Sequence, residues 1–99
     1  MMLRLLFAAV LACAMPLAGA QDSSSRNLAA TCAICHGTGG QAATKDLATL
    51  AGMPRDHLAS QLRDFRDGKR PATVMHQIAK GYTDAQIEQL AAWFAALKR

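Results

Sequence analysis

The segment that most constrains this 99-residue chain is Cys32-Ala33-Ile34-Cys35-His36, a C-x-x-C-H sequence. In a helical segment, residues three and four positions apart share one face, so Cys32 would lie beside both Cys35 and His36. This is the attachment signature of c-type haem, in which the two sulfurs form thioethers with the vinyl groups and the imidazole binds the iron. The motif therefore predicts haem c as the cofactor, Cys32 and Cys35 as its attachment points, and His36 as an axial ligand.

The first twenty residues have the pattern of a secretory signal peptide. Arg4 provides a basic start, residues 5–15 form an apolar run, and Ala18-Gly19-Ala20 matches the small-x-small cleavage pattern. The run is shorter than the roughly 20 residues that a bilayer-spanning helix needs. Lipidation at Cys13 is disfavoured, because Leu11 stands where a small residue is expected. We predict a signal peptide over residues 1–20 and a single periplasmic domain over residues 21–99, with no membrane span in the mature chain.

Helical patterns dominate that domain. β-Branched aliphatic residues are rare after residue 20 and form no alternating run, whereas alanine and leucine recur at helical spacing. We therefore predict an all-α fold. Its first helix should run from about Arg26 into the motif, with Ser24 or Ser25 as its cap, and should end at Gly37, Gly39 and Gly40. The remaining elements should be a turn of helix and then loop over residues 45–52, a helix from Pro54 to Gly68, a short helix over residues 73–80 and a last helix from Thr83.

Two of these helices carry clear burial or capping signals. Leu58, Leu62 and Phe65 form a core-facing stripe on the helix that starts at Pro54. Thr83 and Gln86 have the spacing of a capping box at the start of the last helix. The buried face of that last helix is expected to hold Ile87, Leu90, Phe94 and Leu97.

The charge of the chain is moderately basic and does not indicate nucleic-acid binding. The formal net charge of +4 becomes +3 once Arg4 is removed, and the basic residues are scattered rather than clustered. Two haem propionates would nearly cancel that charge. Lys69, Arg70 and Lys80 flank the Met75 segment and are candidates for steering an acidic redox partner.

The second axial ligand has several candidates. Met75 is best placed, because it lies far enough beyond His36 for a helix to form one wall before the chain returns on the opposite face. Met53 and His57 are alternatives, although a buried methionine is more often core filler than ligand. His76 is the bis-histidine alternative. It cannot point at the iron together with Met75, because adjacent helical residues point about 100° apart.

These segments together resemble bacterial class I cytochromes c. The resemblance rests on the C-A-I-C-H motif and on Leu50-Ala51-Gly52-Met53-Pro54, Arg70-Pro71-Ala72-Thr73-Val74-Met75 and Ile78-Ala79-Lys80-Gly81-Tyr82-Thr83-Asp84. It is strongest to the small monohaem cytochrome subunit of flavocytochrome c sulfide dehydrogenase.

The resemblance implies a fold and a ligand set. The N- and C-terminal helices cross around a covalently bound haem, with Cys32 and Cys35 as attachment points, His36 as proximal ligand and Met75 as distal ligand. One departure is Ala48, which stands where such cytochromes usually carry a proline whose carbonyl accepts the N–H of the proximal histidine. Alanine also has a carbonyl, but the loop loses the stiffness of proline.

The function that this pattern favours is one-electron transfer, with the iron cycling between Fe(III) and Fe(II) in a protein that is not itself an enzyme. The resemblance implies a sulfide-oxidising flavoprotein as electron donor. The alternatives are a freely diffusing carrier that donates to a terminal oxidase, and a haem sensor or enzyme with a labile distal ligand. A thiol oxidoreductase is disfavoured because the sequence has no βαβ context. A zinc site is disfavoured because only two sulfurs are available.

Overall fold

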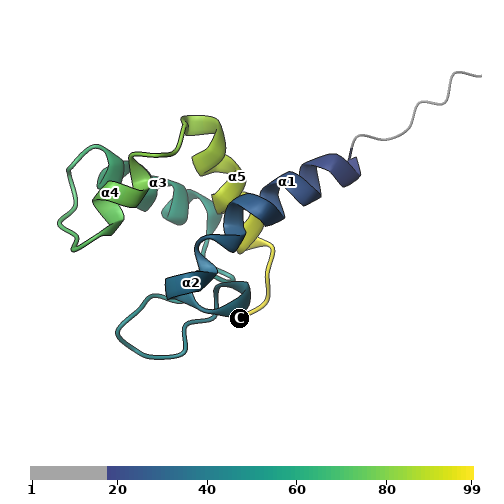
Figure 1. Cartoon of the computed structure of the whole chain (residues 1–99), viewed down its shortest axis with the longest axis horizontal. Coiled ribbons are helices and arrows are strands. Elements are labelled where there is room, and N and C mark those ends of the chain that lie inside the picture. The colour runs from purple at the N-terminus through teal and green to yellow at the C-terminus, as the bar shows by residue number, and fades with distance from the viewer. Residues whose placement is uncertain (1–17) are drawn as a thin grey trace, which may run out of the picture.

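The computed structural model describes residues 18–99, so most of the predicted signal peptide, including Arg4 and Cys13, lies outside the described residues. The described elements are α1 (Ala18–Ala30), α2 (Ala33–His36), the 3₁₀ turn η1 (Thr38–Gly40), α3 (Arg55–Arg66), α4 (Met75–Ala79) and α5 (Asp84–Ala95) (Figure 1). Residues 18–99 contain helices and loops but no strand, which confirms the predicted all-α class. Over the same range, no helix is both long and apolar enough to cross a membrane.

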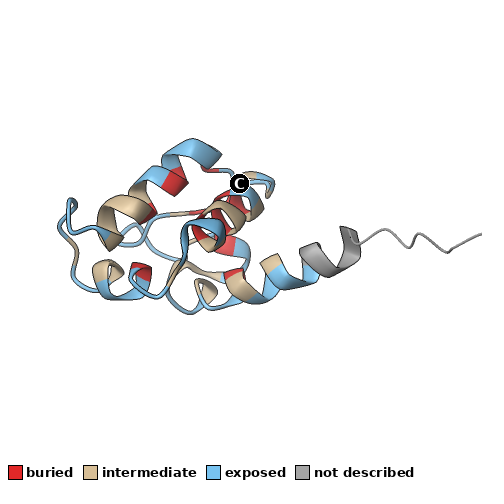
Figure 2. Ribbon diagram, turned by 90° about the horizontal axis from the view of Figure 1, so that it is seen from above, coloured by how far each residue is buried: buried red, intermediate tan, exposed pale blue. Residues whose placement is uncertain are grey.

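The core forms where α5 packs against α1 and α3, and α3 in turn packs against α4. Figure 2 shows the buried residues on the inner faces of these helices. The predicted stripe of α5 is confirmed, since Ile87, Leu90 and Phe94 are buried and Leu97 packs against them half-exposed. The predicted stripe of α3 is confirmed at its two leucines, whereas Phe65 is half-buried.

The first helix differs from the prediction at both ends. It begins at Ala18, so Ser24 and Ser25 lie inside it rather than at its cap. Ala20 and Gln21 are good helix formers and extend the helix past the serines. It also breaks before the motif: the Thr31 hydroxyl donates to the Leu28 carbonyl at 3.0 Å, and the Cys32 N–H donates to the Ala29 carbonyl at 3.0 Å, as in a tighter turn. The motif therefore starts a separate helix, α2.

The prediction of a helical turn in residues 45–52 is wrong, because the polar backbone groups of this segment bond elsewhere. The Gly40 carbonyl accepts the N–H groups of Leu50 at 2.7 Å and Ala51 at 3.1 Å. The Gly52 N–H donates at 2.8 Å to the carbonyl of Phe94, in the last turn of α5, which also accepts the Leu97 N–H at 3.2 Å. These bonds hold the loop after the motif against the C-terminal end of α5.

The other helix boundaries agree closely with the predictions. Pro54 is the residue before α3 rather than its first residue, and Gly68 follows α3 with a φ of 75°. Helix α4 lies within the predicted range 73–80. The capping box of α5 is confirmed by bonds in both directions: the Gln86 N–H donates to Thr83 Oγ1 at 3.2 Å, and the Thr83 N–H donates to Gln86 Oε1 at 2.9 Å.

Ion pairs join α3 to α5 along one side. Glu88 of α5 pairs with Arg55, at 3.0 Å, and with Arg63, while Arg66 pairs with Asp84 at 2.7 Å. Arg63 and Arg66 thus cross-link two helices whose apolar faces form the core.

Candidate haem-binding site

A cavity of about 490 Å³ lies between the motif and the α3–α4 side of the molecule. Its size is typical of sites for cofactors and other small molecules. The lining is mainly apolar and includes all four predicted site residues, Cys32, Cys35, His36 and Met75. The remaining lining residues are Thr31, Asp46, Leu47, Ala48, Leu50, Leu58, Gln61, Leu62, Phe65, Arg70, Val74, Ile78, Tyr82, Leu90 and Phe94. The chain thus brings together at one cavity the residues that the motif and the Met75 segment predict.

Helix α2 arranges the three motif side chains on one turn. Cys32 precedes its first residue and His36 is its last, and the His36 N–H donates to the Cys32 carbonyl at 2.8 Å. Cys32 and Cys35 are not joined by a disulfide. Burial raises the pKa of the Cys32 thiol, and a hydrogen bond with Thr31 only partly offsets this. A raised pKa disfavours the reactive thiolate on which a thiol oxidoreductase depends.

The His36 ring is held in place by the loop opposite the motif. Its Nδ1 lies 2.7 Å from the Ala48 carbonyl oxygen. Because a carbonyl can only accept, Nδ1 must carry the hydrogen, which leaves Nε2 as the nitrogen with a free lone pair. This is the tautomer and the backbone contact that a metal-ligating histidine needs. The contact that the resemblance implies is therefore present with alanine at position 48.

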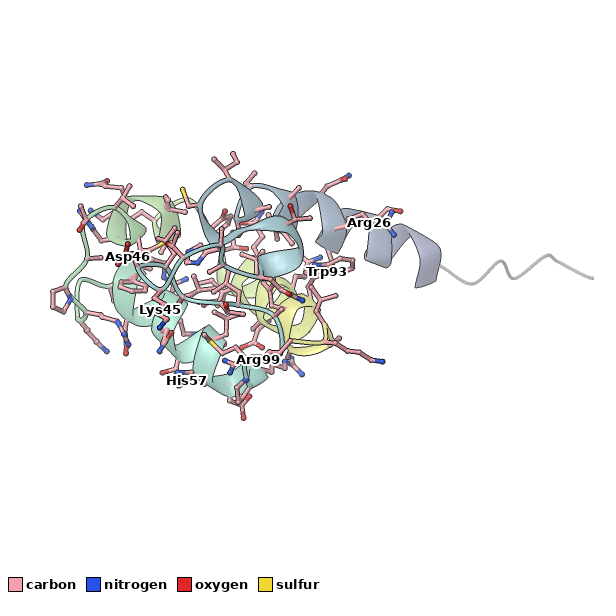
Figure 3. The ribbon with its side chains drawn as sticks, turned by 90° about the horizontal axis from the view of Figure 1, so that it is seen from below. Arg26, Lys45, Asp46, His57, Trp93 and Arg99 are labelled. Atoms are coloured by element: carbon pink, nitrogen blue, oxygen red, sulfur yellow. The ribbon has the colours of Figure 1, made fainter. Side chains whose placement is uncertain are left out.

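The candidates for the other axial position differ in whether they line the cavity. Met75 is the first residue of α4 and lines the cavity. Its neighbour His76 is not among the lining residues, and its Nδ1 is buried with no hydrogen-bond partner. Met53 is only 8% exposed and belongs to the hydrophobic core. His57 is bonded to Gln61 at 2.8 Å and lies at the outer edge of the molecule (Figure 3). The geometry favours Met75.

Some contacts at the cavity are not predicted by the sequence. The Tyr82 hydroxyl lies 3.3 Å from Thr31 Oγ1, so that it links the start of the motif to the segment before α5. The Arg70 guanidinium lies 5.3 Å from the centre of the Phe65 ring. Tyr82 belongs to a segment that carries the family resemblance, but nothing in the sequence indicates a role for its hydroxyl.

The residues present fit a covalently held haem. Two cysteine thiols that form no disulfide lie on the same turn as an imidazole whose tautomer suits a metal, and Met75, which carries a thioether, lines the same apolar cavity. The model of the family described as "Cytochrome C oxidase, cbb3-type, subunit III" matches residues 19–94. The chain belongs to the cytochrome c family.

Individual relatives agree with this placement. The chain is 44% identical over 71 residues to the "Thiosulfate dehydrogenase electron acceptor" of Thiomonas intermedia (strain K12), covering 71% of this chain and 33% of that relative. It is 35% identical over 78 residues to the "Cytochrome subunit of sulfide dehydrogenase" of Chlorobaculum tepidum, covering 79% and 70%. It is 35% identical over 69 residues to "Cytochrome c-554(548)" of Halomonas halodenitrificans, covering 67% and 83%.

The chain thus spans about a third of the first of these relatives and most of the other two. The resemblance to class I cytochromes c is confirmed. As a family member, the protein carries one covalently attached haem c and acts as an electron carrier rather than as an enzyme. A haem of this kind supplies an iron that accepts and releases one electron.

Proposed function

We propose that Cys32 and Cys35 attach the haem, that His36 and Met75 are its axial ligands, and that the cytochrome transfers single electrons in the periplasm. The observation that carries this proposal is the position of His36 and Met75 at one apolar cavity, with His36 Nδ1 already bonded to Ala48. With His36 and Met75 as ligands, the iron would have no open position for substrate. Ligand type, burial and hydrogen bonding then set its reduction potential.

The proposed electron donor is a sulfide-oxidising flavoprotein. Two relatives support a donor that oxidises reduced sulfur, since one is named for sulfide dehydrogenase and the other for thiosulfate dehydrogenase. The alternative is a freely diffusing carrier that reduces a terminal oxidase. The family model is described as an oxidase subunit, which supports an oxidase as redox partner but does not itself indicate free diffusion. Both functions use the same haem site and differ only in the partner.

The mouth of the cavity is the proposed docking surface. Three apolar residues that line the cavity are also well exposed: Val74 by 51%, Leu47 by 42% and Ile78 by 38%. Exposed apolar residues grouped in this way are typical of interaction sites. Lys69 and Lys80 are exposed on the segments before and after Met75. Their positive charge would attract a partner with an acidic rim and increase its association rate at low salt.

Reduction of the ferric protein by a sulfide-oxidising flavoprotein, followed by stopped flow, tests the docking surface. We expect the double variant Lys69→Glu/Lys80→Glu to be reduced several-fold more slowly at low salt and to lose most of its salt dependence. Arg26→Glu is the matched control for each single variant, Lys69→Glu and Lys80→Glu, because it reverses one charge on α1, well away from Lys45 and from Asp46, which lines the cavity (Figure 3). Equal rates for the double variant and the wild type would contradict docking at this surface.

The choice of partner is tested by purification from the native source. Co-purification of a flavin-containing chain with the cytochrome would support the flavoprotein complex. Purification without flavin, together with rapid oxidation by a terminal oxidase, would contradict it and favour the free carrier. Rapid binding of carbon monoxide by the ferrous protein would contradict both carriers and favour a sensor with a labile distal ligand.

A further inference from the structure

Haem c brings two propionate carboxylates, and an apolar cavity gives them few partners. A carboxylate that is removed from water without a counter-charge or hydrogen bonds is strongly destabilised. Of the described residues that line the cavity, two have a side chain of fixed charge at neutral pH, Asp46 and Arg70. Asp46 has the same sign as a propionate and cannot compensate it. Among the described lining residues, only Arg70 has a permanent positive charge.

Arg70 is held at the cavity by its neighbours. Its guanidinium lies 5.3 Å from the centre of the Phe65 ring, and Phe65 also lines the cavity. A cation–π contact of this kind limits the positions that the guanidinium can take without using its N–H groups. The backbone N–H of Arg70 donates to the Asp64 carbonyl at 3.2 Å, which fixes the chain after α3.

The charge of Arg70 is also available. The arginines of α3 are all engaged with carboxylates: Arg55 and Arg63 with Glu88, and Arg66 with Asp67 and Asp84. Within residues 23–99, whose side chains the structure describes, no carboxylate lies within ion-pair distance of Arg70. This guanidinium therefore lines an apolar cavity without an anionic partner from the chain.

We propose that Arg70 binds a propionate of the haem. A guanidinium presents paired donors that match a carboxylate, and such charge-assisted bonds are stronger than neutral ones. The proposal rests on the haem site proposed above and adds a residue to it. It also changes the role predicted for Arg70, which is removed from the basic residues that would steer a redox partner.

The pairing should raise the reduction potential. A positive charge beside the haem favours Fe(II) over Fe(III), and neutralising a propionate acts in the same direction. Removing the guanidinium should therefore favour Fe(III) and lower the potential. We expect a roughly threefold to tenfold change in the Fe(III)/Fe(II) equilibrium, which is about 30 to 59 mV for a one-electron couple.

The test compares Arg70→Met with Lys69→Met in the haem-loaded protein. Both variants lose one positive charge at adjacent positions, but only Arg70 lines the cavity. We expect a lower potential for Arg70→Met and a smaller shift for Lys69→Met that disappears in 1 M salt, where charges beyond about 3 Å are screened. Equal shifts with equal salt dependence would show that Arg70 is an ordinary surface charge and would overturn the proposal.

Two further measurements separate a local effect from a damaged fold. The propionate bending band in resonance Raman spectra should move in Arg70→Met and stay unchanged in Lys69→Met; an unchanged band in both would overturn the proposal. Arg70→Lys keeps the charge, and it should recover most of the potential. The far-red methionine–iron band should persist in all three variants. Absence of covalent haem from the wild type would instead refute the proposed function.

Discussion

The hydrogen bond from His36 Nδ1 is accepted by the backbone carbonyl of residue 48, so it does not depend on the side chain at that position. The carbonyl is positioned because the next residues of the loop are anchored: the N–H groups of Leu50 and Ala51 both donate to the Gly40 carbonyl. At the residue scale, this explains why the missing proline leaves the histidine contact intact. The stiffness comes from hydrogen bonds across the loop.

Replacement of Met75 should change the iron coordination, whereas replacement of His76 should not. We expect Met75→Ala to lose the far-red band of the ferric protein and to bind carbon monoxide rapidly in the ferrous state, because the distal position becomes open. His76→Ala is the matched control and should keep the spectrum of the wild type. A Met75→Ala protein that stays six-coordinate and low-spin, while His76→Ala does not, would assign the ligand to His76.

Prediction of the site residues from sequence has a clear limit. The motif predicts Cys32, Cys35 and His36 because their chemistry is tied to a fixed local spacing. Met75 is harder, because its role depends on which side of a short helix faces a distant turn. The sequence leaves Met53, His57 and His76 as alternatives to Met75. Only the three-dimensional structure shows that none of the three lines the cavity.

At the scale of elements, the loop between the motif and α3 packs against α5 at Gly40. Gly40 has a φ of 76°, and a Cβ atom there would lie 2.8 Å from two atoms of the Phe94 ring and 3.1 Å from the Ala51 nitrogen. Gly39 has a similar φ of 63° but open space around the same position. The two glycines therefore separate backbone strain from close packing.

We expect Gly39→Ala to lower the free energy of unfolding by about 1 to 2 kcal/mol, the cost of a left-handed conformation for alanine. Gly40→Ala should lower the free energy of unfolding by the same amount and by about 1 to 3 kcal/mol more, because the added methyl group overpacks the core against Phe94. Urea denaturation followed by circular dichroism measures both. Equal losses would show that the loop moves away from α5 at little cost.

The same loop shows why some elements cannot be predicted locally. The capping box of α5 and the left-handed residue after α3 depend on neighbours in sequence, and both are confirmed. The conformation of residues 45–52 depends on Gly40 and Phe94, which are distant partners, and the predicted helical turn is wrong. The break before α2 depends on a threonine hydroxyl that competes for a helix carbonyl.

At the scale of the whole molecule, α3 and α5 together form one side of the cavity. Their apolar faces make the core, and Glu88 bridges Arg63 and Arg55 across the edge. Hydrogen bonds from Arg63, and then from Arg55, lower the pKa of Glu88 below its ordinary value of 4.5. Such a small chain buries a limited core, so the apolar surface of a covalently held haem would add burial that the chain alone lacks.

The lowered pKa of Glu88 predicts a pH dependence. Because the folded state holds this carboxylate ionised more strongly than the unfolded state, its stabilising contribution is complete above pH 4.5 and is lost as the pH falls through the lowered folded value. Glu88→Gln should be slightly less stable at neutral pH, and its stability should decrease less steeply below pH 4.5 than that of the wild type.

Asp56→Asn is the control for this prediction, since Asp56 is exposed and, within the described part of the chain, forms no ion pair. Urea denaturation of the three proteins between pH 3 and pH 7 makes the comparison. The same acid dependence in the wild type and in Glu88→Gln would show that the bridge between α3 and α5 contributes nothing in solution.

The central claim is that one covalently attached haem lies between His36 and Met75. The visible spectrum of the secreted, mature protein, oxidised and then reduced, tests it most directly. We predict sharp reduced-state bands that resist acid–acetone extraction, and a far-red band in the oxidised state from the methionine–iron bond. Covalent haem without the far-red band would contradict the role of Met75. Absence of haem, from a host with working haem-attachment machinery, would contradict the whole account.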